Sequence, residues 1–258
     1  MGVIGKVESL WRYPVKSMAG EEREEIFVGY AGVYGDRLYA VGNAQAPARF
    51  PYLTAREEGS MLAYRPRFRH PEKAALPINL AEARGITPTV ADPADLAVDV
   101  ETPSGDRVAI DDPALLSGLT ERVEGAALRL LRSERALTDC RPVSLFSLQT
   151  AAQLGAEIGA VLDKRRFRAN IYIDLDSGMG FAEDSFVGKS LKIGSQLVIS
   201  VLERDARCKM ITLDPDTGKA NPKVLRNVAL AHEGNAGVYA AVLIEGVVRR
   251  GDPIETVE

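Results

Sequence analysis

The first half of the chain alternates short apolar runs with turns, which is the pattern of a mainly β structure. Apolar and polar residues partly alternate over residues 3–13, and shorter apolar runs follow at residues 24–28 and 38–41. Because successive side chains of a strand point to opposite faces, each of these runs predicts a strand. Many short strands joined by turns favour a small barrel or a sandwich.

A β-hairpin is predicted near the end of this half. Residues 96–101 and 107–110 have strand character, and they flank the turn-forming residues 103–106, Pro-Ser-Gly-Asp. Apolar runs on both sides of such a turn are typical of a hairpin. Residues 65–93 are rich in proline and arginine and have little periodicity, so this segment is predicted to be mostly loop.

The second half mixes helices with strands. Residues 112–119 predict a short helix, because Asp112 can cap it and Pro113 fits its first turn. Apolar residues at helical spacing predict a second helix over residues 147–162. Strands are expected at residues 128–132, 171–175, 196–202 and 237–244. The sequence therefore predicts a mainly β fold with some α, which is an α+β fold.

Composition narrows the class of protein further. The chain has 258 residues, 46% hydrophobic and 26% charged, enough for one large domain or two small ones. Its net charge of −4 predicts no general attraction to nucleic acid. No run approaches membrane-spanning length, and the N-terminus lacks the apolar stretch of a signal peptide. Two cysteines are too few for a disulfide framework, which favours a cytoplasmic location.

Several well-known catalytic motifs are absent from the sequence. It contains no phosphate-binding P-loop, no dinucleotide-binding glycine fingerprint and no Gly-x-Ser-x-Gly elbow. It has no Cys-x-x-Cys pair and no zinc-protease histidine spacing. A pair of Cys208 with His232, one of only two histidines, is left open as a minor possibility.

Cys208 is the most informative residue of the chain. It lies between the strand predicted at residues 196–202 and the strong turn sequence Asp-Pro-Asp-Thr-Gly at residues 214–218. Arg204, Arg207 and Lys209 surround it, and nearby cations favour the thiolate, which is both a nucleophile and a metal ligand. A small buried cysteine without chemistry fits this stretch equally well.

Three other short motifs could hold an anion. Lys16 and Ser17 follow the first predicted strand, next to a proline that stiffens the loop. Asp36-Arg37 precedes the strand at residues 38–41, although such a pair is more often a structural ion pair. Phe167-Arg168-Ala169-Asn170 precedes the strand at residues 171–175.

Taken together in this order, these fragments and the Cys208 motif resemble the MOSC family, named for the molybdenum-cofactor sulfurase C-terminal domain. The sequence is more closely similar to the branch with a preceding β-barrel domain, which includes the mitochondrial amidoxime-reducing component and its bacterial relatives. The resemblance implies a small β-barrel-like domain at residues 1–115 and a MOSC β-barrel domain with flanking helices at residues 116–258.

The resemblance also implies a molybdenum cofactor (a molybdopterin) bound between the two domains. Cys208 would be the metal ligand, and Asp139 the one acid to consider for catalysis. Cys140 and Arg141 stand where relatives can have small hydroxyl residues, so backbone contacts are expected there. The implied contacts to the cofactor or its metal are Lys16, Ser17, Arg37, Arg56, Asp139, Cys140, Arg141, Arg168, Asn170, Ala206, Arg207, Cys208 and Tyr239.

Three functions follow from the resemblance. The first is an oxidoreductase that reduces small N-hydroxylated substrates with electrons from a separate donor protein, ferredoxin-like or cytochrome b5-like. The second is a carrier or storage protein for the same cofactor. The third is a sulfur carrier in which Cys208 holds a persulfide, consistent with a thiolate among cations.

Overall fold

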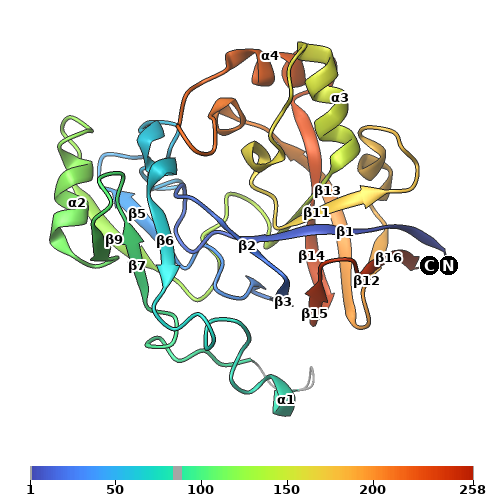
Figure 1. The fold of residues 1–258 in the computed structure, drawn as a ribbon, viewed down its shortest axis with the longest axis horizontal. Helices are drawn as coiled ribbons and strands as arrows, with labels where there is room; N and C mark the ends of the chain where they lie inside the picture. Colours follow the sequence, from blue (N-terminus) through green and yellow to red (C-terminus); the bar gives the residue numbers. More distant parts are fainter. Residues whose placement is uncertain (1, 84–88, 258) are drawn as a thin grey trace.

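The computed structural model describes residues 2–83 and 89–257, and its largest feature is a closed seven-stranded β-barrel (Figure 1). Neighbouring strands follow the order β11-β10-β14-β13-β12-β16-β1, and pairing of β1 with β11 closes the barrel. A short strand β2 (Glu21–Arg23) pairs with the last three residues of β1 and is not part of the closed barrel. The seven strands are β1 (Val3–Arg12), β10 (Val143–Ser147), β11 (Ile171–Leu175), β12 (Ser190–Ile193), β13 (Leu197–Ala206), β14 (Asn235–Ile244) and β16 (Pro253–Val257).

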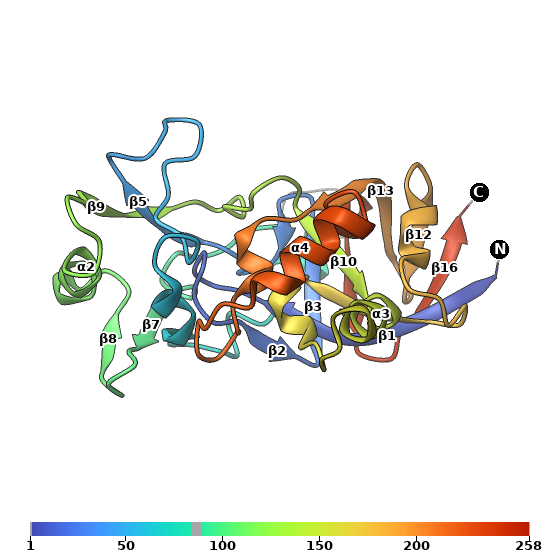
Figure 2. The same ribbon diagram turned by 90° about the horizontal axis from the view of Figure 1, so that it is seen from above.

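Both ends of the chain build this barrel. The first strand, β1, lies between β11 and the last strand, β16, so the two termini lie side by side (Figures 1 and 2). The barrel interior is filled by buried aliphatic side chains, for example Val7, Leu145 and Val201. Because β1 ends at Arg12, the residues that follow in sequence lie at one end of the barrel.

A second group of sheets lies beside the barrel, on the left of Figures 1 and 2. It has its own apolar core, which includes Met18, Leu53 and Leu96. Helix α2 (Pro113–Thr120), a 3-10 turn η1 (Gly59–Ala63) and the four-residue α1 (Leu80–Ala83) belong to this half of the chain. The sheets pair β5 (Tyr39–Asn43) with β9 (Leu128–Arg132), and β6 (Arg65–Phe68) with β7 (Val98–Glu101) and β8 (Arg107–Ala109). A further sheet joins β15 (Gly246–Arg249), β3 (Glu25–Gly29) and β4 (Gly32–Val33); it packs against the barrel, because its buried residues Ile26, Val28 and Val248 belong to the barrel's apolar core.

Two helices cover one side of the barrel. Helices α3 (Leu148–Ile158) and α4 (Pro222–Ala231) lie next to each other in both views. A third apolar cluster lies beneath them and includes Phe146 and Tyr172. Three 3-10 turns complete the structure, namely η2 (Lys164–Phe167), η3 (Ala182–Phe186) and η4 (Lys209–Thr212). The predicted mixed α+β fold with a β-barrel is confirmed.

Two local predictions were wrong or incomplete. Residues 65–68, expected to be loop, form β6, in which the side chains alternate between exposed and buried. Helix α4 was not predicted; Asn221 caps it, and Val224 and Val228 form a narrow apolar stripe. Residues 84–88 of the segment predicted as loop lie outside the described residues.

A buried carboxylate joins the barrel to helix α3. The side chain of Glu183 is fully buried, and its Oε1 accepts hydrogen bonds from the Ser147 backbone N–H at 3.1 Å and the Thr150 hydroxyl at 2.8 Å. Its Oε2 accepts a third from the Ser147 hydroxyl at 2.7 Å. Ser147 is also the N-cap of α3, so the negative charge lies at the positive end of the helix dipole.

Replacing Glu183 with alanine is expected to destabilise the fold. The change leaves buried donors of Ser147 and Thr150 without an acceptor, which should lower the free energy of unfolding by about 2–4 kcal/mol. Urea denaturation measures this difference. The control Ser185→Ala changes an exposed residue of the same 3-10 turn and should stay within about 0.5 kcal/mol of the wild type. Equal midpoints for Glu183→Ala and the control would contradict the assigned role.

Candidate functional site

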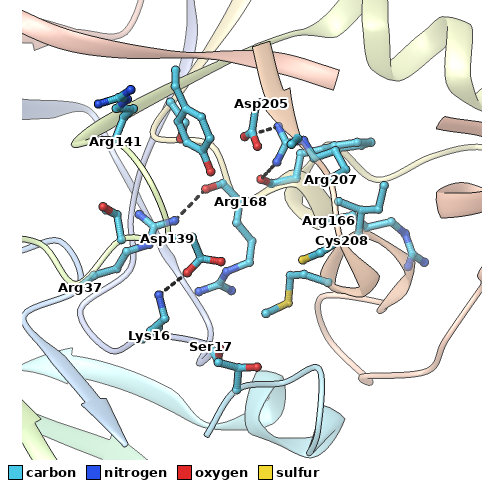
Figure 3. A pocket seen from close by; sticks show the side chains of 18 of the residues that line it. Lys16, Ser17, Arg37, Asp139, Arg141, Arg166, Arg168, Asp205, Arg207 and Cys208 are labelled. Atoms are coloured by element: carbon cyan, nitrogen blue, oxygen red, sulfur yellow. Dashed lines mark hydrogen bonds and ion pairs between the residues drawn. The ribbon is translucent and has the colours of Figure 1, made fainter. Parts of the chain in front are cut away.

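A pocket lies where the open end of the barrel meets the second group of sheets (Figure 3). Its lining comes from segments that are far apart in sequence: the turn after β1, the loops before β5 and β10, the turn after η2, and the end of β13. With the exception of Cys140, every residue that the resemblance implies as a cofactor contact lines this pocket. They are Lys16, Ser17, Arg37, Arg56, Asp139, Arg141, Arg168, Asn170, Ala206, Arg207, Cys208 and Tyr239.

The pocket concentrates positive charge in a chain that is negative overall. Its lining includes seven cationic side chains and two carboxylates, whereas the whole chain carries a net charge of −4. The cations are Lys16, Arg37, Arg56, Arg141, Arg166, Arg168 and Arg207. Cations clustered in a cleft with low-dielectric walls attract anions from solution, so the pocket is suited to an anionic ligand.

Lys16 and Asp139 form an ion pair across the pocket. The Lys16 ammonium also donates to the Leu137 carbonyl at 2.8 Å and lies 4.8 Å from the centre of the Tyr52 ring. Burial lowers the pKa of Lys16, with Asp139 opposing that effect. Burial alone would raise the pKa of Asp139, but the Lys16 charge and hydrogen bond bring it below its usual value. Asp139 is therefore an ionised carboxylate at neutral pH.

Arg37 and Arg168 both stack on the Tyr13 ring, at 4.7 and 4.2 Å from its centre. Arg37 is held by Asp36 and donates to the Arg168 carbonyl at 3.0 Å. Arg168 has no carboxylate partner among the described residues, and its buried Nη2 has no hydrogen-bond acceptor there. Burial is the main cause of its pKa of about 10, and the Arg37 charge adds to that lowering. A buried, unpaired guanidinium donor fits an anionic group of a ligand.

Three pocket residues adopt a backbone conformation that is unusual for side-chain-bearing residues. Ser17, Arg37 and Arg168 have φ values of 66°, 45° and 52°, in the left-handed region. Each such residue costs about 1 kcal/mol or more and persists only where its surroundings enforce it. The non-glycine residues with this conformation in the described chain number five, and three of them line this pocket. Strain of this kind clusters at functional sites.

Arg207 is held in place by four neighbours. Its Nε donates to the Ala236 carbonyl at 2.6 Å, its Nη1 to the Phe167 carbonyl at 3.0 Å, and its Nη2 lies 2.7 Å from Asp205 Oδ2. Gly237 lies against the guanidinium with φ of 80°, and a Cβ there would come within 3.0 Å of Nη2. The register between β13 and β14 shifts at this point, as in a β-bulge, which turns side chains toward a site.

Cys208 lies half-buried at the start of η4, directly after Arg207. Its carbonyl accepts the Ile211 N–H at 3.2 Å, so the backbone turns at this residue, and Met210 and Ile211 also line the pocket. The turn predicted at residues 214–218 is confirmed: Asp214 accepts the Thr217 N–H at 3.0 Å and pairs with Arg166 at 3.1 Å. The loop that carries the thiol is thus anchored on both sides.

Three predicted contacts use their side chains elsewhere. The Asn170 side chain accepts from the Ser144 hydroxyl at 3.2 Å and donates to the Trp11 carbonyl at 3.4 Å, which ties β10 to β1. Arg141 pairs with Glu203 at 2.7 Å. Cys140 is exposed, lies outside the pocket lining, and donates to Glu203 at 3.4 Å. In the structure the side chains of these residues therefore bond to the protein itself.

The structure adds lining residues that were not predicted as contacts to a cofactor. They are Thr54, Thr138, Ser144, Arg166, Phe167, Asp205, Met210 and Ile211. Arg166 belongs to a basic run, and Asp205 alternates with outward-facing residues at the end of β13, so both carried a weak signal. The possible pairing of Cys208 with His232 gains no support, because His232 stacks on Phe181 and contacts Glu157 at 2.7 Å.

Metal-binding residues are sparse around Cys208. In residues 2–83 and 89–257 there is no group of three or more His, Cys, Asp or Glu side chains placed to hold a metal ion. Within the same residues, no helix is long and apolar enough to cross a membrane.

Comparison with protein families assigns both parts of the chain. Residues 132–255 match the MOSC domain, and residues 4–116 match the MOSC N-terminal beta barrel domain. The chain therefore belongs to the MOSC family, which confirms the resemblance of the sequence motifs. MOSC domains are known as molybdenum-cofactor-binding domains similar to the C-terminal domain of a sulfurase.

The solved structures that are similar to this chain have low sequence identity to it. The YUAD protein from Bacillus subtilis is 14% identical, with 98% of this chain and 94% of that chain covered and a TM-score of 0.49. YiiM from Geobacillus stearothermophilus is 20% identical, with coverage of 46% and 55% and a TM-score of 0.35. YiiM from Escherichia coli is 15% identical, with coverage of 46% and 55% and a TM-score of 0.34. No curated protein matches the chain.

Gly237→Ala is expected to lower the free energy of unfolding by more than the strain of a positive φ alone, because the added Cβ would also collide with its neighbours. A Cβ at Gly237 would lie 2.7 Å from the Leu145 carbonyl oxygen and 3.0 Å from Arg207 Nη2. Gly251 has a similar φ of 87° with nothing within 4 Å, so Gly251→Ala is the matched control. We expect the control to cost about 1 kcal/mol and Gly237→Ala about 2–4 kcal/mol, measured by urea denaturation. Equal losses of unfolding free energy in the two variants would show that the close approach of a Cβ to Leu145 and Arg207 has no effect on stability.

Proposed function

We propose that this protein binds a molybdenum cofactor in the pocket and uses it to reduce small N-hydroxylated substrates. The single observation that carries the proposal is that the Cys208 thiol lines the same pocket as a buried Arg168 guanidinium with no ion-pair partner among the described residues. A thiolate suits a thiophilic metal, and an arginine fork suits a phosphate. Membership of the MOSC family supports the same assignment.

The residues present fit such a group. A molybdopterin carries a phosphate, and Arg168 and Lys16 would bind it, with the Ser17 hydroxyl as a further donor. Arg37 would contact the pterin from the same side, and Tyr239 would close the pocket from β14. The proposed division of the chain, residues 1–115 and 116–258, would then place the cofactor at the junction of two domains.

When bound, the cofactor supplies the two-electron chemistry that removes oxygen from a nitrogen–oxygen bond. The chain's own residues bind and orient the reactants. The Cys208 sulfur would hold the metal, and the Arg207 guanidinium, fixed by two backbone carbonyls, would keep the adjacent backbone in place. Apolar side chains of Met210 and Ile211 in the lining would exclude water from the reacting atoms.

Electrons would come from a separate donor protein, ferredoxin-like or cytochrome b5-like. The sequence has two cysteines, too few for an iron–sulfur cluster of four thiolates. The carrier and persulfide functions remain as the alternatives that the experiments below distinguish.

Loss of Cys208 is expected to remove molybdenum from the protein. We expect about one molybdenum per chain in the wild type purified from a host that makes the cofactor, and at least about a tenfold loss in Cys208→Ser. Cys140→Ser is the matched control, because Cys140 is the other cysteine and lies outside the pocket. Metal analysis by mass spectrometry gives the ratio. Equal molybdenum in the wild type and Cys208→Ser would refute the ligand assignment.

Turnover separates a reductase from a carrier. The molybdenum-loaded wild type, supplied with a reduced viologen dye and an amidoxime or hydroxylamine derivative, should form the amidine or amine product. Cys140→Ser should keep this activity and Cys208→Ser should lose it. Full molybdenum loading with no product would favour the carrier function. Radiolabelled sulfur on Cys208, released by a reductant from protein without molybdenum, would favour the persulfide function.

A further inference from the structure

Reduction of a nitrogen–oxygen bond consumes protons as well as electrons. For a hydroxylamine, the balanced change is R₂N–OH + 2 e⁻ + 2 H⁺ → R₂N–H + H₂O. The N–O bond breaks, an N–H bond forms, and the oxygen leaves as water. The two electrons come from the donor protein, but the departing oxygen needs a proton inside a pocket whose lining contains only two carboxyl groups in the described chain, Asp139 and Asp205.

Asp139 is poorly suited to give that proton. Its carboxylate pairs with Lys16, and Arg56 and Arg37 add further positive charge nearby. Although burial opposes this effect, the Lys16 ion pair and hydrogen bond hold the pKa of Asp139 below its usual value. An acid that is already ionised at neutral pH has no proton to donate.

Asp205 has the opposite environment. Its side chain is 2% exposed at the end of β13, three residues before Cys208, where the register shift with β14 turns it into the pocket. Arg207 Nη2 faces its Oδ2 at 2.7 Å, and the Tyr239 hydroxyl donates a hydrogen bond to the carboxylate. In Figure 3, Asp205 and Arg207 lie across the pocket from the Lys16–Asp139 pair.

We propose, on the basis of the proposed reductase function, that Asp205 donates the proton to the departing oxygen of the N-hydroxylated substrate. Oδ2 faces the Arg207 guanidinium, and the carboxyl group lies in the lining of the pocket, where a bound substrate can reach it. The second proton, which ends in the new N–H bond, comes from solvent. After donation, Arg207 and the Tyr239 hydroxyl stabilise the Asp205 carboxylate, and solvent returns its proton.

The titration of Asp205 agrees with this role. Burial raises its pKa to about 6, while Arg207 and the Tyr239 hydrogen bond act in the opposite direction. The other charged groups that face it are Asp139, which also raises the pKa, and Arg37, which lowers it. A carboxyl group with a pKa near the working pH can both hold a proton and release it.

Two variants and a control test the proposal. Asp205→Asn removes the carboxyl group that carries the proton. Tyr239→Phe removes the hydroxyl that lowers the Asp205 pKa, so this variant should shift the midpoint of the Asp205 titration to higher pH. Asp184→Asn is the matched control: burial also raises the pKa of Asp184 to about 6, but that residue lies in η3 and does not line the pocket.

The first measurement needs no activity. In cofactor-free protein labelled with carbon-13 at aspartate carboxyl groups, we expect an NMR titration midpoint near pH 6 that disappears in Asp205→Asn. A second midpoint near pH 6 should disappear only in Asp184→Asn. An Asp205 midpoint below about pH 4.5 would overturn the proposal, since a model aspartate has a pKa of about 3.9.

The second measurement follows single-turnover product formation by pre-reduced, molybdenum-loaded protein from pH 5 to pH 9. The wild-type rate should fall as pH rises through about 6, because the protonated form is lost. Asp205→Asn should be at least about tenfold slower at pH 5.5 and converge with the wild type near pH 8. The Asp184→Asn profile should match that of the wild type.

The outcomes separate the two proposals. A loss by the same factor at every pH would assign Asp205 a purely structural role in holding Arg207, and an unchanged profile in Asp205→Asn would exclude it altogether. Either result would leave the reductase function intact. No product from the loaded wild type would instead overturn the proposed function, and with it the proton donation that rests on that function.

Discussion

The structure of the pocket depends on how seven cations are held close together in one place. Like charges at short range in a partly buried site repel strongly, because the interior screens them less than water does. Carboxylates from four separate segments offset this repulsion: Asp36 pairs with Arg37, Asp139 with Lys16, Asp205 with Arg207, and Asp214 with Arg166. Arg168 has no such partner in the described residues, so the compensation is incomplete at the point where a ligand phosphate would fit.

This arrangement requires a barrel closed by both ends of the chain. Lys16 and Ser17 follow β1, whereas Arg207 and Cys208 follow β13, almost two hundred residues later in sequence. Pairing of β1 with β11 brings Trp11 N–H to the Asn170 carbonyl at 2.8 Å, next to Arg168. The Asn170 side chain repeats this link through Trp11 and Ser144. Asn170, which the family resemblance implies as a cofactor contact, is thus also one of the structural links on which the pocket depends.

Much of this organisation could be predicted from the sequence. Partial alternation of apolar and polar residues identified β1, and helix α3 lies within the predicted range of residues 147–162, with Ser147 as its N-cap. Short motifs and the family resemblance that they carry named twelve of the twenty lining residues of the pocket. The missed elements had weak local signals. Strand β6 contains Pro66, which lacks the N–H that strands normally use, and in α4 only a narrow apolar stripe faces the barrel.

Apart from the ion pair of the neighbouring residues Asp36 and Arg37, side-chain partners could not be predicted, because they depend on segments that meet only in the folded chain. Nothing local to Asp205 indicates that the Tyr239 hydroxyl and the Arg207 guanidinium both face it. Nothing local to Cys140 indicates that its thiol turns outward to Glu203 while its neighbours Asp139 and Arg141 line the pocket. The position of a residue in a family motif therefore predicts where its backbone lies, whereas its side-chain contacts depend on the rest of the fold.

The two carboxyl groups of the pocket illustrate how environment divides roles between chemically identical side chains. Asp139 is half-exposed and next to an ammonium group, so charge pairing outweighs burial and favours the ionised form. Asp205 is buried in a strand, and for it burial outweighs the guanidinium and the tyrosine hydroxyl. Opposite pKa shifts within one pocket are the pattern expected where one acid fixes charge and the other exchanges a proton. Asp139 then belongs to the group that balances the cations, and the proton chemistry falls to the side of the pocket that carries Cys208.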